Sequence, residues 1–165
     1  ANPFYIDTGF SLSEIATVTK VFGFVITLAG AALGGVAVAR YGAARPLVAG
    51  AVLLAASNLA FIGLAQAGPE MGWLIAAICA DNLAAGFVGT IFIAYLSGLT
   101  NVAYTATQYA LFTSLMSLPG RLLSGFSGQI VEMSGWVNFF IYTTAAGIPA
   151  ILLAMLVVRR QRNTA

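Results

Sequence analysis

Three charged side chains, those of Lys20, Asp81 and Arg121, lie inside long apolar stretches of the sequence. A charge held within a membrane is costly, and such residues commonly pair with one another or line the path of a substrate or proton. Arginine can bind a carboxylate through two parallel hydrogen bonds. An aspartate whose pKa is moved by its surroundings can take up and release a proton. Because the three residues carry one surplus positive charge, they favour an anionic ligand.

Small and polar residues accompany these charges at helical spacing, so that each set forms one helix face. The first set is Lys20, Gly23, Thr27, Gly30 and Gly34, and the second is Ser114, Ser117, Arg121, Ser124 and Gly128. On the stretch between them, Asn82 follows Asp81. We therefore expect the three helices that carry these residues to line a polar interior. Weaker polar patterns around Ser57, Asn58 and Thr143 place the two remaining helices further out.

Each of these features also has a structural interpretation. Stripes of small residues commonly serve close helix packing, and Gly30 and Gly34 have the spacing of that motif. Asp81 and Arg121 could form a purely structural ion pair, and Lys20 could extend its charged end outward to the membrane surface.

Five predicted helices position these residues, at roughly 12–39, 46–66, 70–98, 106–131 and 136–158. Each is close to the roughly twenty residues needed to cross a bilayer. Ser11 and Glu14 form a capping box at the start of the first helix. Hydrophobic residues make up 60% of the chain and charged residues 7%, against about 25% charged residues in soluble domains. The predicted fold class is therefore all-α integral membrane, with residues 1–165 in one transmembrane bundle.

The distribution of arginine predicts the orientation of the bundle. Arg40 and Arg45 lie between the first two helices, and three further arginines follow residue 158. By the positive-inside rule these regions face the cytoplasm, so the N-terminal end is periplasmic. Five spans that begin outside indicate an incomplete unit, and we expect at least one helix before Ala1.

Composition excludes several function classes. The chain has no histidine and one cysteine, Cys79, so a Ser-His-Asp nucleophile and a thiolate or imidazole metal centre are excluded. Asp81 is the only carboxylate expected inside a span, which leaves no acid–base pair for an enzyme. There is no phosphate-binding loop, and no cofactor is expected. A net charge of +2 is too small to indicate nucleic-acid binding.

The segment 35–47 resembles the cytoplasmic loop motif of the major facilitator superfamily. The residues that fit this motif are Gly35, Arg40, Gly42 and Arg45. Ala39 stands where an acid is usual, and Ala43 where an arginine is usual. This departure is typical of the second, C-terminal copy of the loop.

A more extensive resemblance covers nearly the whole chain. The run 106–114, continued by Gly120-Arg121, Ser127-Gly128 and 134–140, is similar to the end of AmpG-type muropeptide permeases of that superfamily. Residues 9–20 fit the same family. The register equates the five helices with helices 8–12 of a twelve-helix transporter, so that the N-terminal half and helix 7 would be missing.

The resemblance implies proton-coupled import of N-acetylglucosaminyl-anhydromuramyl peptides across the bacterial inner membrane, for cell-wall recycling. The partners implied are the missing N-terminal half, membrane lipid, the anionic muropeptide and protons. On this interpretation Arg121 binds a substrate carboxylate, and Lys20 draws the anion in from the periplasm. Asn82, Ser117 and Thr27 are further substrate-binding candidates, and Asp81 is the candidate proton carrier.

Two alternatives remain open from the sequence. One keeps the fold but changes the cargo to another anionic solute, of the acetyl-CoA or sugar-phosphate type. The other is a non-transporting membrane module whose buried charges bind a partner helix.

Overall fold

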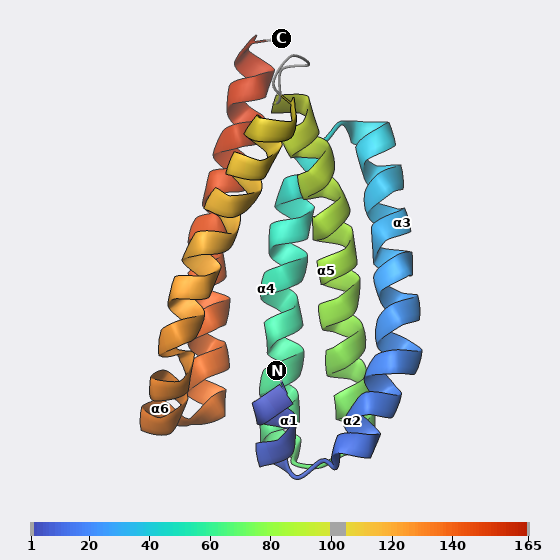
Figure 1. Cartoon of the computed structure of the whole chain (residues 1–165), viewed down its shortest axis with the longest axis vertical. Helices are drawn as coiled ribbons and strands as arrows, with labels where there is room; N and C mark the ends of the chain where they lie inside the picture. The colour runs from blue at the N-terminus through green and yellow to red at the C-terminus, as the bar shows by residue number, and fades with distance from the viewer. Residues whose placement is uncertain (1, 100–104, 165) are drawn as a thin grey trace.

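The computed structural model describes residues 2–99 and 105–164, and within these ranges the chain is helical without a strand (Figure 1). The elements are α1 (Asn2–Thr8), α2 (Leu12–Val18), η1 (Thr19–Gly23), α3 (Phe24–Tyr41), α4 (Ala44–Ala67), α5 (Met71–Leu99) and α6 (Thr105–Thr164). Four stretches in the described part are long and apolar enough to cross a membrane: Leu12–Tyr41, Ala44–Ala67, Met71–Leu99 and Ser127–Arg160. The predicted all-α membrane class is therefore confirmed.

The first membrane-length stretch, Leu12–Tyr41, contains one turn of π-helix. It starts at the expected capping box, where the Ser11 backbone N–H donates to the Glu14 carboxylate and the Glu14 N–H donates to Ser11 Oγ at 3.3 Å. The π turn η1 then joins α2 to α3 and includes Lys20. A π turn accommodates an additional residue and shifts the helix register. A stripe deduced from uninterrupted α-helical spacing therefore does not continue unchanged across it.

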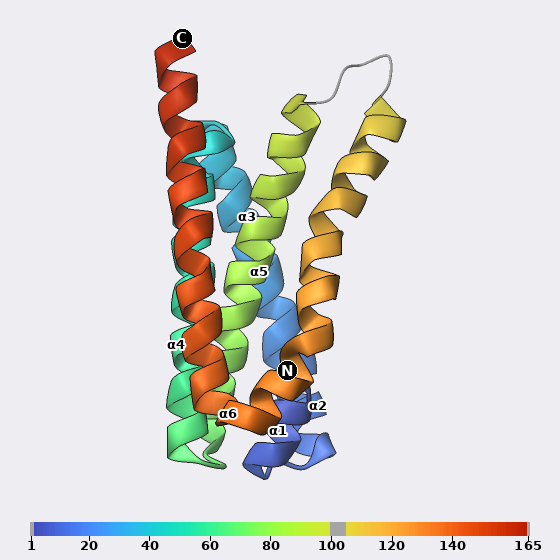
Figure 2. The ribbon, with the colours of Figure 1, turned by 90° about the vertical axis from the view of Figure 1, so that its left-hand side faces the viewer.

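Gly135 divides α6 into two arms. Its backbone has φ 77° and ψ 167°, a conformation that glycine adopts without a side-chain clash. The break falls inside the interval that the sequence left between the fourth and fifth predicted helices. We call residues 105–134 the first arm and residues 136–164 the second arm. Figure 2 shows the two arms running in opposite directions.

The turn between α3 and α4 is closed by Gly42, which has φ 73° and donates its N–H to the Val38 carbonyl oxygen at 2.9 Å. The turn lies at the end of the bundle that also holds the C-terminus, as Figure 1 shows. Helix α1, the α4–α5 connection and the break at Gly135 lie at the opposite end. The two regions predicted to be cytoplasmic thus share one end of the molecule.

Helix α5 packs along α3 on one side and along α4 on another, and α4 packs against the second arm of α6. Glycines allow the α3–α5 contact. A Cβ at Gly30 would overlap the Leu83 carbonyl oxygen, and one at Gly34 would lie 2.7 Å from the Phe87 carbonyl oxygen. A Cβ at Gly86 would meet the backbone of α3 in the same way. The packing interpretation of the glycine stripe is thereby confirmed.

Helix α1, which the sequence did not predict, is anchored by an aromatic cluster. Phe4 is 1% exposed, and its ring centroid lies 4.9 Å from that of Phe140 and 6.0 Å from that of Phe61. The Phe61 and Phe140 rings stack at 5.0 Å. The Trp136 Nε1–H also donates to the Asp7 carboxylate at 3.1 Å. α1 is thereby packed against α4 and the second arm.

The glycine contact yields a stability prediction. Gly30→Ala should lower the free energy of unfolding of the natural protein by about 1–3 kcal/mol, because the new methyl group meets backbone of α5 that cannot move by itself. Thermal unfolding in detergent measures this effect.

Gly35→Ala is the matched control, since a Cβ there has no atom within 4 Å. Because alanine is favoured over glycine inside a helix, it should leave stability unchanged or raise it by up to about 1 kcal/mol. Equal losses for the two variants would contradict the assigned contact.

Candidate functional site

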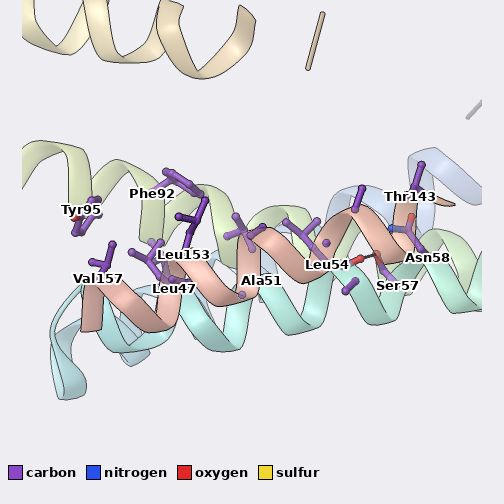
Figure 3. A pocket seen from close by; sticks show the side chains of 18 of the residues that line it. Leu47, Ala51, Leu54, Ser57, Asn58, Phe92, Tyr95, Thr143, Leu153 and Val157 are labelled. Carbon is purple, nitrogen blue, oxygen red and sulfur yellow. Dashed lines mark hydrogen bonds between the residues drawn. The ribbon is translucent and has the colours of Figure 1, made fainter. Parts of the chain in front are cut away.

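A groove of about 580 Å³ runs between α4, α5 and the second arm of α6 (Figure 3). We call this the three-helix groove. Its walls are mainly aliphatic and aromatic, and the labelled side chains in Figure 3 come from all three helices. The sequence did not predict it, because α4 and the second arm carry only weak polar patterns and were expected to lie outside the polar interior. The groove is mainly apolar and is formed by those two helices together with α5, so the predicted polar interior stays a prediction.

Apart from the Tyr95 phenol at the opposite end, the polar groups of the groove lie near one end, where Ser57, Asn58, Asp81 and Thr143 contribute to its lining (Figure 3). Ser57 Oγ donates to the Leu54 carbonyl oxygen at 2.9 Å, and Thr143 Oγ1 donates to the Phe140 carbonyl oxygen at 3.0 Å. Both hydroxyl protons are thus used within their own helices. At this end of the groove, Asn58 and Asp81 are therefore the polar side chains most available to bind a molecule or a segment in the groove.

Asp81 is half-buried, and no hydrogen bond joins its carboxylate to another residue of the described part of the chain. Its negative charge reaches Tyr5 of α1, which is 4% exposed. Burial, and to a lesser extent the Asp81 charge, raises the pKa of the Tyr5 phenol well above its ordinary value, so the phenol stays protonated. The neutral Tyr5 hydroxyl of α1 therefore lies within electrostatic range of the Asp81 carboxylate of α5.

Thr27 and Asn82, both predicted to bind substrate, meet in the α3–α5 contact. Thr27 Oγ1 lies 3.0 Å from Asn82 Oδ1 and 2.7 Å from the Gly23 carbonyl oxygen, and it can donate to either. Asn82 Nδ2 donates to the Ile78 carbonyl oxygen at 2.8 Å. The two side chains satisfy one another and the adjacent backbone, so in this structure they hold two helices together.

Lys20 is exposed and lies in the π turn, away from the lining of the three-helix groove. It does not join Asp81 there, although the helices that carry the three charges were expected to line one polar interior. Arg121 and Ser117 lie on the first arm of α6, and their side chains are outside the described part of the structure. The proposed Asp81–Arg121 encounter therefore stays a prediction.

The loop-motif residues cluster at the end of the bundle that holds the C-terminus. Arg40 is exposed in the last turn of α3, and Arg45 is exposed in the first turn of α4. Gly42 closes the turn between them. Gly35 lies one to two turns earlier in α3, where a side chain would meet open space. The described residues include no group of three or more histidine, cysteine or acidic side chains placed to hold a metal ion.

Membrane-length helices packed through small residues define a multi-pass, all-helical membrane protein. No protein-family model matches the chain. It is 36% identical over 155 residues to the "Putative transporter AmpG 4" of Rickettsia conorii, covering 94% of this chain and 37% of that protein. It is 34% identical over 148 residues to the "Anhydromuropeptide permease" of Escherichia coli K12, covering 89% and 30%.

A third relative, the "Putative transporter AmpG 3" of Rickettsia prowazekii, is 34% identical over 142 residues, covering 86% of this chain and 34% of that protein. The chain is thus homologous to the C-terminal region of AmpG-named transporters, the family that the sequence resemblance indicated. It spans about a third of the length of these relatives.

The Thr27–Asn82 contact can be tested by a double-mutant cycle. Thr27→Val and Asn82→Leu remove the two polar groups with little change of shape. Unfolding measurements on the natural protein should give a coupling free energy of about 0.6 kcal/mol, and at most about 1.7 kcal/mol.

Thr27→Val combined with Thr143→Val is the matched control. The Thr143 hydroxyl bonds only within its own helix among the described residues and shares no partner with Thr27, so this pair should be additive. A Thr27–Asn82 cycle that is also additive would show that the hydrogen bond does not stabilise the fold.

Proposed function

We propose that the chain is the C-terminal part of a secondary transporter that imports N-acetylglucosaminyl-anhydromuramyl peptides from the periplasm to the cytoplasm. The observation that carries this proposal is the 34% identity to an anhydromuropeptide permease over 89% of the chain. The fold adds support, because the described part of the chain consists of membrane-length helices with isolated ionisable residues. Such residues inside spans commonly mark a substrate or proton pathway.

Arg121 is proposed to bind a carboxylate of the peptide portion of the substrate. Its guanidinium group stays charged under all physiological conditions and can donate two parallel hydrogen bonds to one carboxylate. Lys20 is proposed to attract the anion before it reaches Arg121. This role suits an exposed lysine in the π turn that follows α2, since Figure 1 shows α2 at the end of the bundle opposite the C-terminus. With the C-terminus in the cytoplasm, that end faces the periplasm of the bacterial inner membrane.

Asp81 is proposed to carry the coupled proton. It is half-buried on a membrane helix, it lines the three-helix groove, and it has no hydrogen bond within the described residues. A carboxylate in such a place is sensitive to a nearby change of charge, because burial favours its neutral form and a cation favours its charged form. Substrate that occupies Arg121 would withdraw that cation from Asp81 and so couple the two fluxes.

Transport is proposed to proceed by rocking of two helix bundles around a central site. The bundle described above would be one of the two, and the remaining length of the relatives would supply the other. Asn82, Ser117 and Thr27 are retained as proposed substrate contacts. Thr27 and Asn82 bond with each other between α3 and α5, so substrate would reach them only if these two helices separate. Gly35, Arg40, Gly42 and Arg45 are proposed to act in the conformational change at the cytoplasmic end.

Substitution of Arg121 tests the substrate assignment. Uptake of labelled anhydromuropeptide into energised spheroplasts should fall about 10- to 100-fold in Arg121→Ala, the effect of losing a hydrogen bond to a charged group worth about 1.5–3 kcal/mol. Arg121→Lys should retain an intermediate rate, since it keeps the charge but not the paired donors.

Arg159→Ala is the control, because it removes an exposed arginine near the end of the second arm. It should transport at the natural rate. If the natural protein, well expressed and energised, takes up no anhydromuropeptide, the cargo assignment is wrong.

Proton coupling is tested at Asp81. Asp81→Asn should abolish accumulation driven by a proton gradient, while exchange of labelled for unlabelled substrate across the membrane continues. The amide fills the same space but cannot be ionised. Accumulation that persists in Asp81→Asn and still collapses with a protonophore would place the proton carrier elsewhere.

A further inference from the structure

The polar end of the three-helix groove borders the buried aromatic cluster that anchors α1. On α5, Asp81 follows the buried Ile78 by three residues, and on the second arm Thr143 follows Phe140 by the same interval. Residues three apart lie on one face of a helix, about one turn from each other. Ile78 and Phe140 belong, together with Tyr5 of α1, to one hydrophobic cluster. Asp81 therefore lies about one helical turn from the packing around Tyr5.

Tyr5 brings a hydroxyl group to this border. The residue is 4% exposed, and its ring centroid lies 5.7 Å from that of Phe4 and 6.3 Å from that of Phe61. Among the described members of the cluster, only Tyr5 and Trp136 have a polar side-chain atom, and the Trp136 Nε1–H donates to Asp7. The Tyr5 hydroxyl is thus the polar group of the cluster that is left for another partner.

Neither the Tyr5 hydroxyl nor the Asp81 carboxylate has a hydrogen-bond partner among the described residues. The described part of the chain also has no buried side-chain nitrogen or oxygen without a partner. The Tyr5 hydroxyl therefore reaches open space, although the rest of its ring is buried. Burial, more than the nearby Asp81 charge, raises the pKa of Tyr5, so the phenol stays protonated and can donate. An unused donor and an unused acceptor thus lie within electrostatic range of each other.

The other titratable side chains are less suited to act on Asp81. Tyr95 also lines the groove, but it follows Asp81 by fourteen residues on α5, about 21 Å away. Lys20 of η1 and Glu14 of α2 are exposed and do not line the groove. The groove-lining residues of α4 and the second arm carry only hydroxyl and amide groups as polar side chains. The side chain of Arg121 on the first arm lies outside the described part of the structure.

We propose that Tyr5 is a positioning residue for Asp81, and that its hydroxyl donates a hydrogen bond to the ionised carboxylate, directly or through one water. This inference rests on the proposed role of Asp81 as the proton carrier. Rotation of the Asp81 side chain between staggered conformations, or one bridging water, brings the two groups together. The donor stabilises the charged form, because a hydrogen bond to a charged group is stronger than one to a neutral acid. Tyr5 therefore favours release of the proton from Asp81.

The anchoring of α1 gives this hydrogen bond a use in transport. Phe4 packs against Phe61 and Phe140, which fixes Tyr5 relative to α4 and the second arm. The Asp81 carboxylate belongs to α5. A movement of α1 relative to α5 would therefore remove the donor and strengthen proton binding at Asp81. Helix movement and proton binding are linked in this way through one contact.

Carbodiimide labelling of the natural, full-length protein in membranes tests the proposal. Dicyclohexylcarbodiimide reacts with protonated carboxyl groups in apolar surroundings, and mass spectrometry gives the labelling rate of the Asp81 peptide at each pH. In Tyr5→Phe, the pH of half-maximal labelling should rise by about one unit, a tenfold increase in proton affinity, because the ionised form loses its donor. Phenylalanine keeps the ring and its packing, so the fold is retained.

Tyr95→Phe is the matched control, since it removes a hydroxyl from the opposite end of the same groove. It should leave the labelling midpoint unchanged. Asn58→Leu removes the other available donor at the Asp81 end, and it should move the midpoint less than Tyr5→Phe does. A purely structural role of Tyr5 would lower thermal stability in detergent without moving the midpoint.

An unchanged midpoint in Tyr5→Phe, or an equal rise in Tyr95→Phe, would overturn the proposal. A rise in Asn58→Leu alone would do the same, because it would identify the amide as the donor. Labelling that is absent at every pH from both the natural protein and Tyr5→Phe would show that Asp81 does not gain and lose a proton, with the same consequence.

The labelling needs neither substrate nor uptake, so failure of the proposed function can be distinguished from failure of this inference. A natural protein that takes up no muropeptide would refute the cargo assignment and leave the midpoint measurement intact. Proton coupling that persists in Asp81→Asn would refute the carrier role, while a midpoint shift in Tyr5→Phe would still establish the contact.

Discussion

Close backbone contact between α3 and α5 is the interaction on which the rest of the arrangement depends. In a bilayer, helices gain little by exchanging lipid for one another, so association rests on packing, on interhelical hydrogen bonds and on small residues that let backbones approach. Gly30, Gly34 and Gly86 provide that approach, and the Thr27–Asn82 hydrogen bond lies within it. With one face of α5 committed to α3, its other faces are left for α4 and the three-helix groove.

This arrangement assigns different roles to two adjacent polar residues. Asn82 faces α3, where it bonds with Thr27, whereas Asp81 lines the groove on another side of α5. Neighbouring residues on a helix point about 100° apart, since 3.6 residues complete one turn. The amide therefore serves the fold while the carboxylate stays available for chemistry, and a substitution at either position should be interpreted separately.

The sequence was informative wherever local length, hydropathy and turn chemistry determine structure. The membrane-length helices, the Ser11–Glu14 capping box and the interruption before residue 136 could all be predicted in this way. Helix α1 could not, because seven residues show too little periodicity and its stability comes from distant aromatic partners. The groove was missed for a related reason, since it depends on three helices meeting and not on the pattern of any one of them.

The site was predicted less completely than the fold. Placing Thr27 on the same helix face as Gly30 and Gly34 was correct, but the helix that this face meets could be identified only from the structure. Lys20 was assigned to that face by counting α-helical turns, and the π turn invalidates such counting. The same π turn also affects how this segment can tolerate insertions during evolution. A single-residue insertion can be absorbed there as a local bulge, so the helix start at Ser11 and the glycine contact further along need not shift together when the length of this segment changes.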